Sequence, residues 1–536
     1  MSTGIREKRL RRRIRGLYST DSQFADARPD DEVTVASGRP GLRLAHIAAT
    51  VMKGYADRPA LGQRAVQFVT DSDTGRTAAE LLPRFDTITY GELWDRAGAA
   101  AAAMANKPVR QGDRVCVLGF NSVDYAVTDV ALIRLGAVSV PLPVGTFVGQ
   151  LRRIVAETQP SVIASSIDFL AEAVELALTA HTPTRLVVFD YHPEVDDERE
   201  AFDAAKRQLV DARSIMIMEP MTDLLARGKR LSLAPLVVPD EADPLKLLIY
   251  TSGSTGAPKG AMYPEHLVAN FWRRSSGFLG PACAPSITLN FMPMSHALGQ
   301  HILYGTLGSG GTAYFVAKRD LSTVLDDIAL VRPTDLNFVP RIWEMLFDEF
   351  QGQLDRRVTG GADPATLEVE IVAELREKLV GGRHVSARTS SAPISAELKT
   401  WVESFLDMHL VESYGSTEAG PILIDGQVRR PPVTDLKLAD VPDRGYFHSD
   451  RPHPRGELLV KSDELFAGYY KRPEVTAGVF DPDGYYRTGD LVAEVGPGRL
   501  VYLDRRNNDF VPVSRRGAAF GKRSRVDKVT VRPETA

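Results

Sequence analysis

The sequence has few cysteines, no long apolar run and almost no excess of charge. Its two cysteines, Cys116 and Cys283, stand among apolar or small residues, which argues against a disulfide framework and favours a reducing compartment. We therefore expect a cytoplasmic protein. The most apolar stretch, 127–144, is interrupted by Arg134 and by two prolines, which excludes a transmembrane helix. Because 65 basic residues balance 69 acidic ones, the net charge creates no electrostatic field that would attract nucleic acid.

The N-terminus is rich in arginine, but no apolar signal-peptide core follows it, so it is not a secretion signal. Leu10, Ile14 and Leu17 recur at helical spacing. This pattern predicts an N-terminal basic helical segment over 1–40, with one apolar stripe and a solvated arginine face. A helix that binds a membrane surface or a polyanion is the alternative.

The most informative stretch is Tyr250–Gly260, YTSGSTGAPKG, which directly follows an apolar run. Its three glycines, four Ser and Thr hydroxyls and one lysine are suited to wrapping a polyphosphate, because glycine lets backbone N–H groups approach the oxygens. We call 250–260 the phosphate loop. It is not a Walker A loop, since Gly260 stands where a Ser or Thr would hold magnesium. An ordinary polar loop after a strand is the structural alternative.

Short apolar strands alternate with helical patterns along most of the chain, which indicates βαβ units and an α/β fold. The run 113–120 predicts a buried strand, 121–136 a helix capped by Asn121 or Ser122, and the next apolar run a second strand. From about Asp440 the pattern changes to short strands and turns rich in Pro, Gly and Asp, which predicts a small β-subdomain. With 536 residues the chain is too long for one core.

The phosphate loop resembles the signature of the acyl-adenylate-forming superfamily of AMP-binding enzymes. Further segments resemble the same superfamily in the same order: FMPMSHALGQ (291–300), SSAPIS (390–395), ESYGSTEAG (412–420), RGELLVKSDELFAGYYKRP (455–473) and GYYRTGD (484–490). The stretches GYFHSDRPHPRGEL and YLDRRNN look most like the adenylation domain of actinobacterial carboxylic acid reductases, whose relatives include fatty-acid-CoA ligases.

The resemblance implies a large N-terminal adenylation domain of two βαβ-type subdomains plus a small β-subdomain. We expect AMP-binding α/β subdomains over 41–439, the small β-subdomain over 440–508 up to a hinge, and a divergent, disordered tail over 509–536. The family continues after the hinge into a swinging C-terminal domain of about a hundred residues. Only 28 residues follow Asn508 here, and Val511 stands where reductase relatives place a lysine. We therefore expect the swinging domain and its catalytic lysine to be missing.

The implied chemistry is ATP-dependent activation of a fatty or aromatic carboxylic acid to acyl-AMP. Two anions must meet, so positioning and charge neutralisation matter more than a base. By resemblance, Glu418 is the Mg²⁺ ligand, Thr417 donates to the α-phosphate, Lys259 is a cation near the departing pyrophosphate, and His296 stands at the mouth of the acid pocket. We expect these four to be the catalytic residues.

The resemblance also implies the residues that hold the nucleotide. Tyr414 offers a flat face for adenine, and Asp490 accepts both ribose hydroxyls, since a carboxylate is a natural acceptor for a diol. Arg505 reaches the ribose as well. The full expected set is Thr251, Ser252, Gly253, Ser254, Thr255, Gly256, Lys259, His296, Ser391, Glu412, Ser413, Tyr414, Thr417, Asp490, Tyr502, Leu503, Asp504 and Arg505.

Two positions in these motifs depart from the family pattern. Ser390 stands where glycine is expected, so its extra bulk narrows the pocket, and Gln300 replaces an arginine that would assist carboxylate binding. Three functions stay open on the sequence: an acyl-adenylate-forming enzyme impaired by truncation, a functional acyl-CoA ligase, or a nucleotide- and acyl-binding remnant without turnover. Beside the acid, the expected partners are CoA or a phosphopantetheine carrier.

Overall fold

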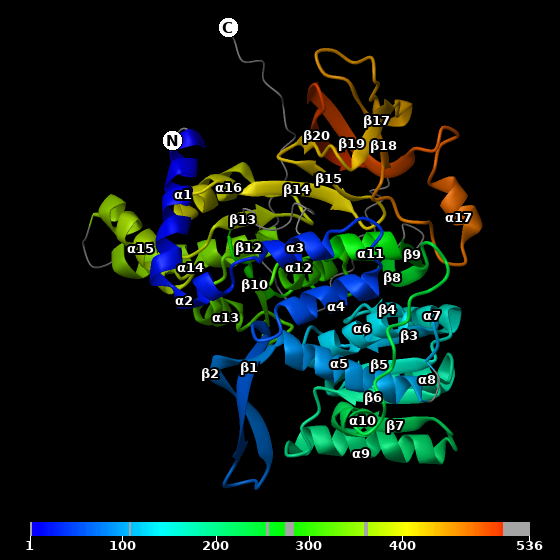
Figure 1. The fold of residues 1–536 in the computed structure, drawn as a ribbon. Coiled ribbons are helices and arrows are strands. Elements are labelled where there is room, and N and C mark those ends of the chain that lie inside the picture. Colours follow the sequence, from blue (N-terminus) through cyan, green and yellow to red (C-terminus); the bar gives the residue numbers. More distant parts are fainter. Residues whose placement is uncertain (1–2, 107–108, 253–256, 274–283, 359–362, 507–536) are drawn as a thin grey trace.

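The computed structural model describes residues 3–106, 109–252, 257–273, 284–358 and 363–506 (Figure 1). The strands form three sheets, and one of them combines strands from before and after the segment that builds another. The mixed α/β architecture that the sequence predicts is confirmed. The expected tail, 509–536, lies outside the described residues.

A seven-stranded sheet forms the first α/β unit, with the strand order β7-β6-β5-β3-β4-β8-β9. Its strands are parallel except at the β9 edge, where β8 and β9 run antiparallel on either side of the phosphate loop. The strands are β3 (Arg114–Leu118), β4 (Val138–Leu142), β5 (Val162–Ser166), β6 (Arg185–Phe189), β7 (Ile217–Pro220), β8 (Leu245–Ser252) and β9 (Pro258–Pro264). The connecting helices are α5 (Tyr90–Ala105), α6 (Val123–Leu135), α7 (Val148–Thr158), α8 (Leu170–Thr179), α9 (Asp196–Asp211) and α10 (Met221–Gly228).

The start of α6 resolves the two capping alternatives. Ser122 Oγ accepts a hydrogen bond of 3.1 Å from the Tyr125 N–H, so Ser122 is the N-cap. Asn121 instead donates 2.7 Å to the Met292 carbonyl and accepts 3.1 Å from the Met294 N–H. It thereby fixes the loop that precedes His296 to this first unit.

A four-stranded sheet with the order β10-β11-β1-β2 forms the second unit. Its strands β1 and β2 make a long hairpin that projects from the body of the molecule (Figure 1). The strands are β1 (Pro59–Thr70), β2 (Thr77–Thr89), β10 (Ile287–Asn290) and β11 (Thr312–Phe315). The helices next to these strands in the sequence are α4 (Leu44–Gly54), α11 (Glu265–Phe271), α12 (Ala297–Gly308) and α13 (Val324–Val331).

The third sheet has nine strands in the order β12-β13-β14-β15-β16-β20-β19-β18-β17. It begins as parallel strands and continues as antiparallel ones. The strands are β12 (Asp335–Phe338), β13 (Ser386–Thr389), β14 (Val411–Ser416), β15 (Gly420–Ile424), β16 (Gln427–Val428), β17 (Val433–Ala439), β18 (Arg455–Ser462), β19 (Tyr486–Gly496) and β20 (Arg499–Arg505). The helices beside them are α14 (Pro340–Val358), α15 (Pro364–Lys378), α16 (Ala396–Leu406) and α17 (Pro473–Gly478).

The β-rich part reaches further upstream than the sequence pattern indicates. Strand β17 ends at Ala439, before the expected boundary at residue 440, yet it pairs with β18 along its length. Strands β14 to β16 join the same sheet. The domain boundaries given above therefore stay predictions.

The N-terminal arginine-rich segment folds as α1 (Thr3–Thr20), α2 (Ser22–Asp26) and α3 (Asp31–Ser37). Ile14 is buried, and Leu10 and Leu17 pack beside it on a small core that includes Phe24 and Val385. The predicted apolar stripe is confirmed and faces the protein itself. No helix in the described ranges is long and apolar enough to cross a membrane.

Candidate functional site

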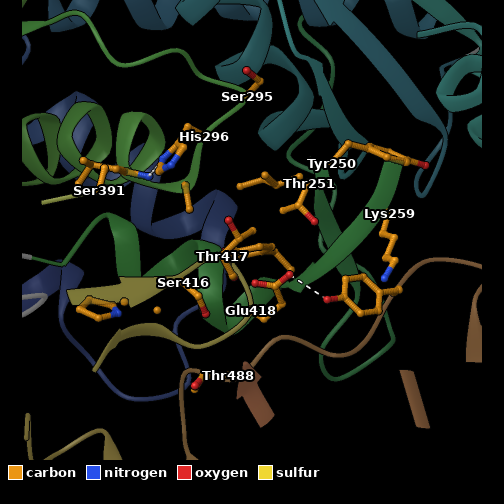
Figure 2. A pocket seen from close by; sticks show the side chains of 18 of the residues that line it. Tyr250, Thr251, Lys259, Ser295, His296, Ser391, Ser416, Thr417, Glu418 and Thr488 are labelled. Carbon is orange, nitrogen blue, oxygen red and sulfur yellow. Dashed lines mark hydrogen bonds between the residues drawn. The ribbon is translucent and has the colours of Figure 1, made fainter. Parts of the chain in front are cut away.

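A cavity of about 1190 Å³ is lined by residues of the seven-stranded sheet, the nine-stranded sheet and α12, and it gathers most of the residues that the motifs single out (Figure 2). Its volume suits a nucleotide and a small acid together, since ligand pockets typically enclose about 300–1,000 Å³. The expected site residues that line it are Thr251, Lys259, His296, Ser391, Ser413, Tyr414, Thr417, Glu418, Asp490 and Arg505. These come from segments more than two hundred residues apart in the chain.

The phosphate loop begins and ends on paired strands. Thr251 at the end of β8 lies opposite Lys259 near the start of β9. Both line the cavity, and the Lys259 ammonium lies 5.5 Å from the centre of the Tyr469 ring. Four of the expected phosphate ligands, Gly253, Ser254, Thr255 and Gly256, lie outside the described residues, as does the side chain of Ser252.

The segment 413–418 lines the cavity. The Glu418 Oε1 accepts a hydrogen bond of 2.8 Å from the Tyr469 hydroxyl, shown as a dashed line in Figure 2, while the Thr417 carbonyl accepts one from Tyr263. Gly415 must be glycine, because a Cβ there would stand 2.2 Å from the Gly420 carbonyl oxygen.

Ser413, at the start of this segment, and Glu412, just before it, have polar partners elsewhere in the nine-stranded part of the protein. Ser413 lines the cavity and its Oγ accepts 2.9 Å from the Arg388 guanidinium. Glu412 is not among the residues that line the cavity, and its carboxylate pairs with Lys399 on α16. The structure therefore places the Glu412 side chain away from the rest of the candidate site.

Two further residues of the cavity wall contact each other: the Tyr414 hydroxyl donates 2.6 Å to Oδ2 of Asp490. Asp490 is 6% exposed, and burial raises the pKa of its carboxyl group. The Arg505 Nε lies 3.5 Å from Asp490 Oδ1, on a side chain that is 60% exposed. This corner therefore offers a nearly buried carboxylate beside an aromatic ring and a cation.

Three further residues are expected in this corner. Tyr502, Leu503 and Asp504 belong to β20 but are not among the residues that line the cavity. The Tyr502 ring centre lies 6.2 Å from that of Tyr414, so Tyr502 supports the ring expected to face adenine.

His296 is the N-cap of α12, and its Nδ1 accepts 3.1 Å from the Leu298 N–H. Because Nδ1 is an acceptor, the ring proton of neutral His296 is on Nε2. Burial lowers the pKa of this imidazole, so the ring is neutral at pH 7. His296 therefore presents a neutral N–H donor at the cavity wall (Figure 2).

Ser391 lines the same cavity as His296 and Ser390. Its φ of 69° is in the left-handed region, which is uncommon for a residue other than glycine. Gln300 is buried and its amide donates 2.9 Å to the Met294 carbonyl. Gln300 thus braces the loop before His296 instead of facing the substrate.

Tyr469 contacts both Glu418 and Lys259, although the sequence motifs do not indicate a role for it. The residue stands in the GYYKRP segment, but a spacing of 51 residues from Glu418 gives no signal in one sequence. Arg506 is a second addition to the cavity wall, where its guanidinium donates 2.7 Å to Glu457.

Comparisons with known proteins agree with this geometry. The family model described as AMP-binding enzyme matches residues 62–470. A carboxylic acid reductase of Mycobacterium tuberculosis is 60% identical over 96% of this chain and 45% of its own length. The chain thus spans about half the length of the curated relatives it matches.

This chain covers a larger share of two solved structures. The adenylation domain of the Segniliparus rugosus carboxylic acid reductase, in complex with AMP and a co-purified carboxylic acid, is 47% identical with a TM-score of 0.89, over 93% of this chain and 80% of that one. The A-PCP didomain of the same reductase, in complex with AMP, is 48% identical with a TM-score of 0.90, over 93% and 70%. The resemblance seen in the motifs is confirmed, and the chain belongs to the AMP-binding enzymes as an adenylation domain of the carboxylic acid reductase type.

Proposed function

We propose that the chain activates a carboxylic acid with ATP. An oxygen of the substrate carboxylate attacks the α-phosphorus, a new O–P bond forms, and the bond from the α-phosphorus to the bridging oxygen breaks. Pyrophosphate leaves with the electron pair of that bond, and acyl-AMP remains. Because both reactants are anions, the protein must supply positive charge and hydrogen-bond donors at fixed positions.

The observation that carries this proposal is the presence of two different chemistries on the wall of one cavity. Asp490 and Tyr414 form a nearly buried acceptor and an aromatic face, which suit a nucleoside. Glu418 and Lys259 are both in contact with Tyr469 and suit phosphates and their counter-ion. The relative with AMP and a carboxylic acid bound supports the same pairing of ligands.

His296 and Thr417 would act where the two reactants meet. The Nε2–H of His296 is a neutral donor, suited to a carboxylate or to an α-phosphate oxygen. Burial lowers the pKa of this imidazole, so without ligand it is a neutral donor. Thr417 is held by the bond from Tyr263 to its carbonyl.

The residues present fit Mg²⁺ as a partner of ATP. No cluster of three or more His, Cys, Asp or Glu side chains suited to a metal exists in the described part of the chain. One carboxylate, Glu418, faces the cavity, and Mg²⁺ is commonly held by one or two carboxylates plus substrate phosphates. When bound, the ion would neutralise charge on the phosphates.

We also propose that the acid is a fatty or aromatic one and that a phosphopantetheine thiol of a carrier domain accepts the acyl group. The structure of a related A-PCP didomain favours a carrier over free CoA. An acyl-CoA ligase is the alternative acceptor assignment. A cytoplasmic location stays a prediction from the cysteine content.

The test is ATP–pyrophosphate exchange with labelled pyrophosphate and a panel of fatty and aromatic acids. We expect exchange that depends on both acid and Mg²⁺. Binding of AMP without exchange for any acid would instead support a nucleotide-binding protein without turnover. Adding CoA or a phosphopantetheinylated carrier then identifies the acceptor by thioester formation.

A further inference from the structure

The segment 466–472 lies along β9 and meets the phosphate loop at its C-terminal side. The Ala467 N–H donates 3.0 Å to the Met262 carbonyl, the Met262 N–H donates 2.9 Å to Gly468, and the Tyr470 N–H donates 2.8 Å to Gly260. An isolated bridge also pairs Ala261 with Tyr469. The segment is therefore fixed to the strand that carries Lys259.

The same segment is fixed to Glu418. The Phe466 N–H donates 2.8 Å to the Glu418 carbonyl, and the Tyr469 hydroxyl donates 2.8 Å to Glu418 Oε1. Within the described ranges, Tyr469 is the one hydrogen-bond donor to the Glu418 carboxylate. Both the backbone and the side chain of Glu418 thus depend on one short segment for their position.

Tyr469 itself has little freedom to move. Its side chain is 6% exposed, its ring packs edge-on against Phe466 at 4.9 Å, and its N–H donates 2.9 Å to Thr476 Oγ1. The ring also lies 5.5 Å from the Lys259 ammonium. A buried and well-packed hydroxyl is a rigid donor, which costs little entropy when it orients a partner.

We propose that Tyr469 is a positioning residue that holds the Glu418 carboxylate ready for Mg²⁺. The inference rests on the function proposed above, in which Glu418 is the metal ligand. The hydroxyl occupies Oε1 and leaves Oε2 for the ion, so it fixes the carboxylate rotamer without consuming the metal-binding oxygen. Carboxylate ligands are commonly held by such outer partners, and losing one lowers metal affinity about 10–100-fold.

Tyr469→Phe tests the role of the hydroxyl while keeping the ring over Lys259. We expect the Mg²⁺ concentration for half-maximal ATP binding, measured by calorimetry, to rise about tenfold. AMP binding without metal should stay within about twofold of wild type, because the proposed nucleoside contacts, Asp490 and Tyr414, are unchanged. A hydroxyl with a merely structural role would weaken AMP binding as well, and that outcome overturns the proposal.

Tyr485→Phe is a matched control, since it removes a tyrosine–carboxylate hydrogen bond to Asp435 outside the cavity. It should keep the wild-type Mg²⁺ dependence. If Tyr469→Phe also keeps it within twofold, Tyr469 does not position the ligand. If wild type itself shows no Mg²⁺-dependent ATP binding, the proposed function fails first, so the two failures are distinguishable.

A double-mutant cycle gives an independent check. In a Glu418→Gln background, Tyr469→Phe should have no further effect on the Mg²⁺ dependence, because the hydroxyl acts through the carboxylate. Additive effects of the two substitutions would mean that Tyr469 acts on the metal or the phosphates by another route, and would overturn the assignment.

Discussion

The hydroxyl of Tyr414 donates a hydrogen bond of 2.6 Å to Asp490, a residue 76 positions later in the chain. The two side chains come from β14 and β19, which are not neighbours in the nine-stranded sheet. The bond leaves Asp490 Oδ1 beside Arg505. One carboxylate oxygen is thus already occupied, and its orientation is fixed before any ribose arrives.

We predict that Asp490→Ala weakens AMP binding by about 1.5–3 kcal/mol, the usual range for lost charge-assisted hydrogen bonds. Calorimetric titration with AMP measures the effect directly. Asp435→Ala serves as the control, because this carboxylate also accepts from a tyrosine but lies outside the cavity. An affinity of Asp490→Ala within threefold of wild type would contradict the ribose assignment.

Lys259→Met should separate ATP from AMP. If Lys259 contacts the terminal phosphates, ATP binding falls by about 1.5–3 kcal/mol while AMP binding stays within about twofold. Lys461→Met is the control, since the Lys461 ammonium also lies over a tyrosine ring, 4.3 Å from the centre of Tyr485, outside the cavity. Equal losses for ATP and AMP in Lys259→Met would place this lysine elsewhere on the nucleotide.

Contiguous motifs made much of the candidate site predictable from the sequence. Thr251, Lys259, the 413–418 segment and Asp490 each lie in a run whose residue order is informative by itself, and all of them line one cavity. Leu503 and Asp504 stood in an equally clear run but do not line the cavity. Side chains alternate along a strand, so adjacent residues of β20 cannot all face one side.

Long-range pairings could not be predicted. The bond between Tyr469 and Glu418 depends on how 466–470 aligns with β9, and no spacing rule fixes such an alignment. Likewise, the alternation of strands and helices predicts parallel units but not that β12 to β14 continue into the antiparallel strands that follow. Local patterns specify elements, whereas packing specifies which edges meet.

Buried His384 should make stability depend on pH. Burial, with Arg13 nearby, lowers the pKa of His384 to about 3, and its Nε2–H donates 3.0 Å to the Leu406 carbonyl. The unfolded chain takes up this proton near pH 6.5, whereas the folded chain stays neutral until about pH 3. The stability that neutral His384 contributes is therefore fully present above pH 6.5, and it is lost as the pH falls towards 3.

Within this window, the free energy of unfolding should fall by about 1.4 kcal/mol for each pH unit. Urea midpoints at pH 7.5, 6.5 and 5.5, followed by intrinsic fluorescence, measure it for wild type and His384→Gln. The glutamine variant has no group to titrate, so the gap between the two midpoints should narrow as the pH falls. Parallel curves would show that His384 does not carry this dependence.

The last prediction separates the two jobs of His296, which caps α12 through Nδ1 and presents Nε2–H to the cavity. Asparagine is a good N-cap but too short to reach as far as an imidazole, so His296→Asn should keep the helix and lose the donor. Removing one preorganised donor costs about 10²–10³ in turnover. We expect His296→Asn to lower ATP–pyrophosphate exchange by that factor, whether the donor contacts the acid carboxylate or an α-phosphate oxygen. His296→Ala should show the same rate loss and an added destabilisation of about 1 kcal/mol from the missing cap. Exchange by His296→Asn within threefold of wild type would exclude His296 from stabilising the reacting groups.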